Sequence, residues 1–227
     1  MKGLFQRLRN SLRLYGVGGT GIKLGSWLAE YWFDMRYQVE TLRAVELDDL
    51  TIESENKVSG FSYQPTRVLP LRKLFQLILP LIPAESVLVD FGCGKGRVLI
   101  VASEFGFKEV RGVEFSQELC KIARSNCAIY KARTGVLTEF RIIQADVAEY
   151  AVNADEIVIF LFNPFNERVM AAALINICTS LELSPRKMLL IYHNPEYDQV
   201  FGLCDDFVKL YDLNYWGYKF TVYSSAG

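Results

Sequence analysis

Three glycines at every second position follow an acidic residue in the stretch DFGCGKGR, a pattern suited to holding a small ligand against the backbone. The glycines are Gly92, Gly94 and Gly96, and Asp90 stands two residues before the first. Without side chains, the backbone amides of such a loop approach a ligand closely. The dinucleotide pattern GxGxxG requires a glycine at position 97, where this chain has Arg97. The loop therefore favours a ligand that carries a cationic group and no phosphate.

Two further acidic residues follow the next two strand-like segments. Glu114 stands at the end of the second strand, in RGVEF, and Asp146 ends the segment IIQAD. A carboxylate at the end of the second strand can accept hydrogen bonds from both hydroxyls of an unphosphorylated ribose. Because the carboxyl ends of parallel strands meet at one edge of a sheet, we expect Asp90, Glu114 and Asp146 to lie together. The alternative is an ordinary α/β domain whose strand ends happen to be polar.

The elements that must position these acids alternate between strand and helix from Ser86 onward. We expect helices over residues 96–106, 116–132 and 167–183, with Ser116 as an N-cap. The segment 206–225 is typical of a hairpin. Strands are expected over residues 86–91, 109–115, 140–146, 156–163 and 187–194. This alternation predicts a mostly parallel sheet that is covered by helices on both faces.

Residues 1–85 do not alternate in this way. Residues 4–14 place apolar side chains on one helical face and arginines on the other, while residues 26–42 and 71–82 are expected to form two more helices. Residues 16–21, GVGGTG, are interpreted as a hinge between helices. We therefore predict a helical extension over residues 1–59, on the substrate side or used for interaction, and an α/β domain that carries the glycine loop over residues 60–227.

Composition restricts the classes of protein that the chain can belong to. Its 227 residues carry a formal charge of −1, so no global basic excess indicates nucleic acid as a partner. The single histidine, His193, rules out a metal site built on several histidines, and we expect no metal. Five cysteines without a CxxC pair predict no disulfide framework and favour a cytoplasmic location. We expect no membrane-spanning segment, because no apolar run reaches about 18 residues.

The run of an acid followed by GxGxG resembles the first motif of the class I S-adenosylmethionine-dependent methyltransferases. The resemblance implies a Rossmann-like seven-stranded sheet of strand order 3-2-1-4-5-7-6, with S-adenosylmethionine as cofactor. It further implies that the loop packs on the methionine part of the cofactor, that Asp90 helps to hold its ammonium group and that Asp146 contacts adenine. The cofactor-binding residues expected from these motifs are Asp90, Gly92, Gly94, Gly96, Glu114, Phe115, Asp146 and Val147.

The fourth strand leads into FNPF, which supplies the candidate catalytic residues Asn163, Pro164 and Phe165. This segment resembles the (Asp/Asn)-Pro-Pro-(aromatic) motif of amino-group methyltransferases, although it lacks the second proline. It is also similar to the Asn-Asn-Phe segment of the non-SET protein lysine methyltransferases. The resemblance implies that Asn163 and Pro164 accept the N–H bonds of an amine and that Phe165 packs near the methyl group. A simple Asn-Pro turn is the alternative.

Five other residues have more than one interpretation. Tyr63 and Thr66 belong to the segment SYQPT, which resembles a Tyr-x-Pro segment that closes over the cofactor in the non-SET lysine family; a surface turn is the alternative. His193 follows the fifth strand and is interpreted either as a base or as a capping or loop residue. Lys95 and Arg97 either meet the cofactor carboxylate or face solvent, and solvent is the favoured interpretation for Lys95.

These motifs predict an enzyme that transfers a methyl group to an amine nitrogen of a protein substrate, of the lysine type. The whole chain resembles a group of bacterial methyltransferase-like proteins that share YQPT, DFGCGKGRVL, GVEFS and FNPF. One alternative is methylation of nucleic acid or of a small amine. An alternative of another class is a non-catalytic cofactor-binding module that docks to a partner or, through the amphipathic residues 1–15, to a membrane surface.

Overall fold

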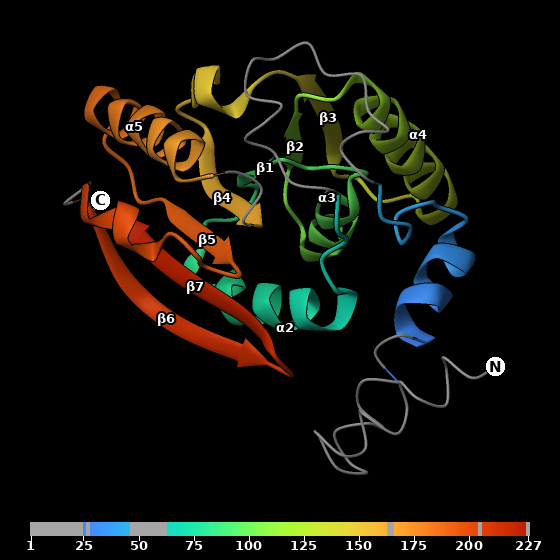
Figure 1. Cartoon of the computed structure of the whole chain (residues 1–227). Helices are drawn as coiled ribbons and strands as arrows, with labels where there is room; N and C mark the ends of the chain where they lie inside the picture. The colour runs from blue at the N-terminus through green and yellow to red at the C-terminus, as the bar shows by residue number, and fades with distance from the viewer. Residues whose placement is uncertain (1–24, 26–27, 46–62, 163–165, 204–205, 226–227) are drawn as a thin grey trace.

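A mixed sheet with helices on both faces forms the centre of the molecule (Figure 1). The computed structural model describes residues 25, 28–45, 63–162, 166–203 and 206–225. The strand order is β3-β2-β1-β4-β5-β7-β6, and only the pairs that include β7 are antiparallel among the described strands. This seven-stranded arrangement confirms the predicted Rossmann-like fold and strand order.

The strands of the sheet are short and buried in the middle and longer at one edge. The central strand β1 is buried at all five of its residues, as a strand covered on both faces must be. The strands are β1 (Val87–Phe91), β2 (Glu109–Glu114), β3 (Glu139–Gln144), β4 (Glu156–Phe162), β5 (Leu189–His193), β6 (Phe207–Tyr215) and β7 (Tyr218–Ser225).

The helices divide into two layers that follow the alternation of side chains along the strands. One apolar cluster joins α2, α3 and α4 to side chains such as Leu88, and the other joins α5 to side chains such as Val89. The helices are α2 (Val68–Ile78), α3 (Arg97–Ala102), α4 (Gln117–Thr134) and α5 (Glu167–Leu183), with 3-10 turns η3 (Leu79–Leu81), η4 (Ser103–Phe105), η5 (Val147–Glu149) and η6 (Asp198–Leu203).

Local sequence signals account for several element boundaries. The Ser116 hydroxyl accepts the amide N–H of Leu119, which makes it the expected N-cap of α4. Trp216 and Gly217 both have positive φ, which is the backbone of a two-residue hairpin turn between β6 and β7. The hairpin at residues 206–225 is therefore confirmed. Helix α2 begins three residues before the expected start at position 71, because Pro70 fits the first turn of a helix.

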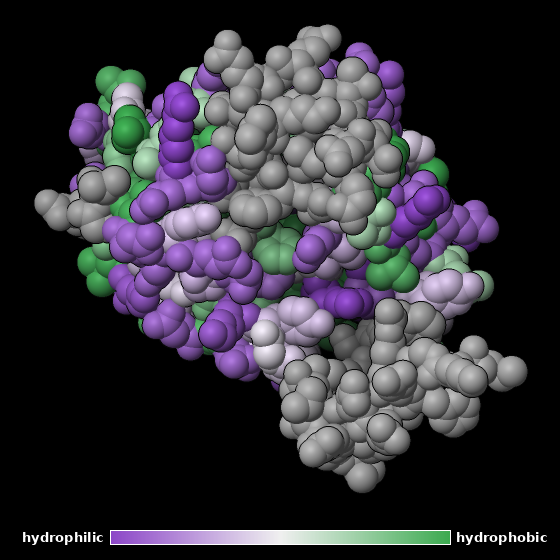
Figure 2. Space-filling view, viewed as in Figure 1, coloured by the Kyte–Doolittle hydropathy of each residue, from purple (hydrophilic) through white to green (hydrophobic). Residues whose placement is uncertain are grey.

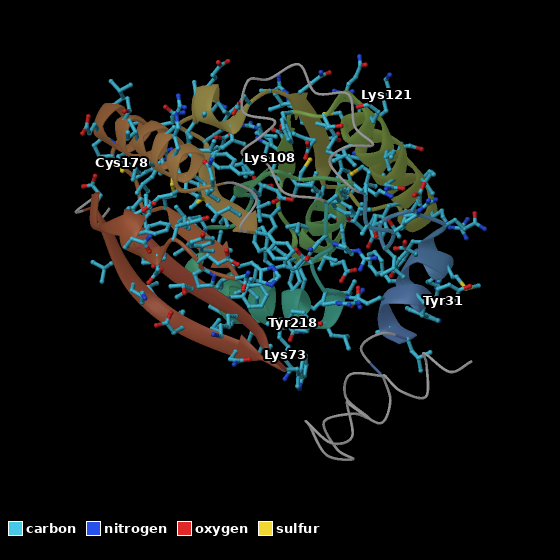
Figure 3. The ribbon with its side chains drawn as sticks, viewed as in Figure 1. Tyr31, Lys73, Lys108, Lys121, Cys178 and Tyr218 are labelled. Atoms are coloured by element: carbon cyan, nitrogen blue, oxygen red, sulfur yellow. The ribbon has the colours of Figure 1, made fainter. Side chains whose placement is uncertain are left out.

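Residues 28–37 form a helix that packs beside α2 and α3 (Figure 1). Its inner side buries Phe33, whereas Leu28, Trp32 and Met35 on the outer side are more than half exposed. Tyr31 also projects from the outer side, away from the sheet (Figure 3). The helix ends at residue 37 rather than 42, because Gln38 takes a positive φ and turns the chain back toward the sheet. The helix expected at residues 4–14 lies outside the described residues.

The face of the molecule seen in Figure 2 is largely hydrophilic over the β6–β7 hairpin, with apolar surface over α5. On α5, Ile175 and Leu183 are large apolar side chains that are exposed. In the described part of the chain, no helix combines the length and the apolar character needed to cross a bilayer.

The sequence predicts no disulfide framework, but one cysteine forms a disulfide that the spacing did not indicate. Cys178 of α5, which is labelled in Figure 3, is disulfide-bonded, while Cys93, Cys120 and Cys127 are buried free thiols. A disulfide depends on the distance between two Cα atoms in the fold, which cysteine spacing along the chain does not reveal. Disulfides are uncommon in reducing compartments, so the cytoplasmic location stays a prediction.

Candidate active site

The glycine loop connects β1 to α3 at the carboxyl edge of the sheet, where the sequence predicted it. The amide of Gly92 donates to the carbonyl of Val113 on β2 with an N···O distance of 2.8 Å, so the loop is tied to the neighbouring strand. Gly94 has a φ of +52°, and a Cβ added there would overlap the ring of Tyr63. Glycine is thus required at this position both by backbone conformation and by close packing.

Glu114 is the last residue of β2 and its carboxylate is buried against the loop. Oε2 accepts the amide N–H of Gly94 at 2.9 Å, and Oε1 accepts the amide N–H of Ser116 at 3.0 Å. Burial raises the pKa of Glu114 to about 7, although these N–H donors oppose the shift. Each carboxylate oxygen retains a second lone pair, so the group can still accept hydrogen bonds from a ligand.

Asp90 lies within β1, one residue before its end, and is 2% exposed. Burial raises its pKa well above the ordinary value, and the nearby charge of Glu114 raises it further. No hydrogen bond to its carboxylate is formed within the described part of the chain. Two buried acids with few compensating cations disfavour a phosphate and fit a cationic ligand that donates hydrogen bonds. S-adenosylmethionine has this character, so the residues present fit that cofactor.

The third acid lies just beyond β3 rather than at its last residue. Asp146 accepts the amide N–H of Ala148 at 2.9 Å and caps the turn η5, while Val147 beside it is buried. The amide of Ala145 donates to the carbonyl of Glu114 at 3.1 Å, which places the start of this turn next to the end of β2. The structure therefore brings the second and third acids to one edge of the sheet.

Tyr63 and Thr66 precede α2 and differ in their surroundings. The Tyr63 ring packs on Gly94, and its hydroxyl donates to the backbone carbonyl of Thr41 at 2.7 Å. Thr66 is buried at 4% exposure. Tyr63 is therefore part of the loop's packing and not a surface turn residue. Phe115, expected beside the cofactor, is partly exposed directly after Glu114.

Lys95 and Arg97 do not face solvent, so those expectations are corrected. Lys95 is 1% exposed, and its Nζ lies 2.7 Å from Oε1 of Glu40. Arg97 is 2% exposed and forms ion pairs with Glu30 and Asp34 of the helix at residues 28–37. Because Glu30, Asp34 and Thr41 engage all three guanidinium nitrogens, these contacts argue against the interpretation of Arg97 as a partner of the cofactor carboxylate. The partners come from a segment far away in sequence, and no local pattern indicated them.

His193 is not a capping or loop residue but the last residue of β5, and it is 2% exposed. Its imidazole stacks between the rings of Phe162 and Phe220, with centroid distances of 3.9 and 4.4 Å. Burial lowers its pKa to about 3, so the ring is neutral. Such an imidazole is a weak proton acceptor, which argues against the interpretation of His193 as a base.

The predicted catalytic residues Asn163, Pro164 and Phe165 lie outside the described residues. The strand that leads to them is described: β4 ends at Phe162, and Leu161 pairs with Phe91 at the end of β1. The chain therefore leaves β4 beside the start of the glycine loop. After this segment, Asn166 caps α5 by accepting the amide N–H of Val169 at 3.1 Å. Within the described residues, no cluster of three potential metal ligands occurs.

Comparison with known proteins agrees with this geometry. A family model described as "Methyltransferase domain" matches residues 88–182. A protein-lysine N-methyltransferase of Saccharolobus islandicus is 27% identical over 107 residues, which are 46% of this chain and 63% of that protein. The chain thus spans less than two thirds of the length of this relative.

Solved structures share the fold at low sequence identity. A Haemophilus influenzae protein assigned as a methylase superposes with a TM-score of 0.56 at 16% identity, over 70% of this chain and 99% of that one. An RNA methyltransferase of Salinibacter ruber, solved with S-adenosyl-L-homocysteine, gives 0.51 at 21% identity, over 71% and 93% of the two chains.

The family match, the strand order and the glycine loop with its acids define the class of the protein. Residues 88–182 match a methyltransferase domain, and the sheet and glycine loop are those expected of the class I S-adenosylmethionine-dependent methyltransferases. This confirms the family, the type of enzyme and the cofactor that the sequence motifs predicted. The acceptor of the methyl group is a separate question.

Proposed function

We propose that the protein transfers a methyl group to an amine nitrogen of a protein substrate, of the lysine type. The main observation behind this proposal is that β4 ends beside the glycine loop and its buried acids. The segment Asn163-Pro164-Phe165 follows β4 directly in the sequence. The named lysine methyltransferase among the relatives supports a protein acceptor. The chain has no basic excess, which would have favoured RNA or DNA.

In this proposal the carboxyl edge of the sheet binds the cofactor. Asp90 holds the cationic amino-acid end, and the lone pairs that Glu114 has left accept the ribose hydroxyls. Asp146 and Val147 line the adenine side. Gly92, Gly94 and Gly96 present backbone without side chains, with Tyr63 and Thr66 on the methionine side. When bound, S-adenosylmethionine supplies a methyl group that its sulfonium already activates.

The residues after β4 position the acceptor. The side-chain oxygen of Asn163 and the carbonyl of Pro164 accept N–H bonds of the amine, which aims the nitrogen lone pair. Phe165 packs against the positive charge that the reaction moves, a contact of about 0.5–2 kcal/mol. Positioning is the main contribution required of the protein, because the methyl group arrives activated. His193 does not receive the amine proton in this proposal, because its pKa is lowered to about 3.

The acceptor class is tested with S-adenosylmethionine labelled in its methyl group and a cell lysate. After incubation with the full chain, we expect label in protein and, after acid hydrolysis, in methylated lysine. Label confined to RNA, DNA or small amines would overturn the protein proposal and support the first alternative. Binding of the cofactor without any transfer would support a non-catalytic module. The matched control is the Asn163→Ala variant, which should bind the cofactor and transfer little label.

A further inference from the structure

A buried ionic cluster joins the helix at residues 28–37 to the end of the glycine loop. Arg97 is the first residue of α3, directly after Gly96. Its guanidinium forms an ion pair with Glu30, and both side chains are buried. A second ion pair joins Nη2 of Arg97 to Oδ1 of Asp34 at 3.0 Å. The remaining carboxylate oxygen of Glu30 accepts the amide N–H of Val68, the first residue of α2, at 2.9 Å.

The same cluster fixes the chain that follows the helix, residues 38–45, which we call the strap. Asp34 accepts the amide N–H groups of Thr41 and Leu42, both at 2.7 Å, and the hydroxyl of Thr41 at 2.6 Å. Nε of Arg97 donates to that hydroxyl oxygen at 2.7 Å. Thr41 is therefore held from two sides, by an acid of its own segment and by the arginine of α3.

Further contacts tie the strap to the loop itself. Asn126 of α4 accepts the amide N–H of Glu40 at 2.9 Å, and its Nδ2 donates to the carbonyls of Glu40 and Lys95 at 3.1 and 3.0 Å. Nζ of Lys95 lies 2.7 Å from the Glu40 carboxylate. Side chains of the glycine loop and of α4 thus hold the strap against the backbone of the loop.

The strap in turn holds Tyr63. The Tyr63 hydroxyl donates to the carbonyl of Thr41 at 2.7 Å, and the Tyr63 amide donates to the carbonyl of Val45 at 2.9 Å. The ring held in this way lies on Gly94, and Nζ of Lys95 is 5.7 Å from its centroid. A continuous set of contacts therefore runs from Arg97 through Thr41 to the side chain that covers the central glycine.

From this geometry we propose that Arg97 is a positioning residue for the cofactor: it clamps the strap so that Tyr63 covers the glycine loop. The proposal rests on the cofactor site described under the proposed function. It makes residues 28–45 part of that site and not a separate substrate module. A buried ion pair is by itself weak evidence for stability, since apolar residues often replace one without loss. The three guanidinium nitrogens of Arg97 contact three different groups, Glu30, Asp34 and the Thr41 hydroxyl, and this planar fork suits a role in fixing the register of the strap.

The test measures binding of S-adenosyl-L-homocysteine by titration calorimetry and the melting temperature of the full chain. Arg111→Lys is the matched control. Arg111 is also a buried arginine held by acids, with Asp155 at 2.6 Å and Glu109 and Glu156 at 3.0 Å, but those contacts lie away from the glycine loop. Tyr63→Phe keeps the ring and removes only the hydrogen bond to Thr41. Glu114→Ala tests the cofactor site itself.

We expect Arg97→Lys and Arg111→Lys to lower the melting temperature, and only Arg97→Lys to weaken binding, by about tenfold or more. Tyr63→Phe should weaken binding by about three- to tenfold with little change in melting temperature. Binding that stays within about twofold of wild type in Tyr63→Phe overturns the proposal, even if Arg97→Lys does not fold. If Glu114→Ala also leaves binding unchanged, the assignment of the cofactor site is wrong. If Glu114→Ala is the only variant that weakens binding, the cofactor site stands and the proposed role of Arg97 is wrong.

Discussion

The amide N–H of Gly94 donates to Oε2 of Glu114 across 2.9 Å, and this hydrogen bond joins the two sequence motifs at the centre of the site. It orders the glycine loop against the end of β2 before any ligand binds. It also keeps the Glu114 carboxylate facing the loop. The expected behaviour of the site follows from this pair and from the neighbouring Asp90.

Replacing Glu114 by alanine should weaken binding of S-adenosylmethionine by about 1–3 kcal/mol, since ribose hydroxyls lose their acceptor and Gly94 loses its partner. Titration calorimetry measures the change. Glu109→Ala is the control, because Glu109 lies at the other end of β2 and pairs with Arg111. If both variants bind like the wild type, Glu114 does not contact the ribose.

The affinity for S-adenosylmethionine should rise as the pH increases through about 7. Burial raises the pKa of Glu114 from 4.5 to about 7, so below about pH 7 the free protein holds a proton there, which must leave before both carboxylate oxygens can accept the ribose hydroxyls. Asp90 shifts in the same direction and adds to the effect. Titrations at several pH values check this. An affinity that is flat between about pH 6 and 8 would contradict the proposed role of an ionised Glu114 as the acceptor of the ribose hydroxyls.

Stability of the free protein should show the opposite trend. The unfolded chain loses the Glu114 proton near pH 4.5 and the folded chain near pH 7, so the folded form binds more protons in between. Protonated Glu114 stabilises the folded protein most below about pH 4.5. This contribution to the free energy of unfolding falls by on the order of 3 kcal/mol as the pH rises to about 7. Urea unfolding of wild type and Glu114→Ala at both ends of this range isolates the contribution. Equal pH slopes in the two proteins would refute it.

A methyl group at Gly94 should disrupt the site more than one at Gly106. Both glycines have positive φ, +52° and +77°, so alanine is strained at each by roughly 1 kcal/mol. Only at Gly94 would the new Cβ overlap the ring of Tyr63, whereas nothing lies within 4 Å at Gly106. We expect Gly94→Ala to lose cofactor binding and Gly106→Ala to lose only stability. Equal cofactor affinities in calorimetry would show that Tyr63 does not pack on the loop in solution.

Replacing Asn163 by alanine should lower the rate of methyl transfer at least about tenfold and leave cofactor binding nearly unchanged, because its proposed contacts are to the acceptor. The matched control is Asn166→Ala, which removes the N-cap of α5 and should cost about 1 kcal/mol of stability. Initial rates with labelled cofactor distinguish the two variants. Turnover of Asn163→Ala at the wild-type rate would make Asn163 a turn residue.

Much of the framework could be predicted from sequence, because local patterns determine it. Helix α5 occupies the predicted residues 167–183, and Ser116 caps α4 as expected. The glycine loop and Glu114 meet at the predicted edge of the sheet. These features depend on periodicity, turn residues and strand ends, which can be recognised in a short window of sequence.

The remaining features depend on contacts between distant segments. Glu30 and Arg97 are separated by 67 positions, and nothing local indicates that they pair. The pattern of the helix at residues 28–37 is misleading, since Glu30 and Asp34 face inward while Leu28 and Trp32 are exposed. The acids are buried because Arg97 neutralises them there. The burial of Lys95 could not be predicted from its neighbours in the sequence either, because its partner, Glu40, is 55 positions away.

The most direct test is a binding titration of the wild-type chain with S-adenosylmethionine and, in parallel, with NAD. The buried acids at the glycine loop predict saturable binding of S-adenosylmethionine that Glu114→Ala weakens, and no binding of the dinucleotide pyrophosphate. Binding of NAD, or failure to bind S-adenosylmethionine, would contradict the assignment of this loop as a site for a cationic nucleoside without phosphate.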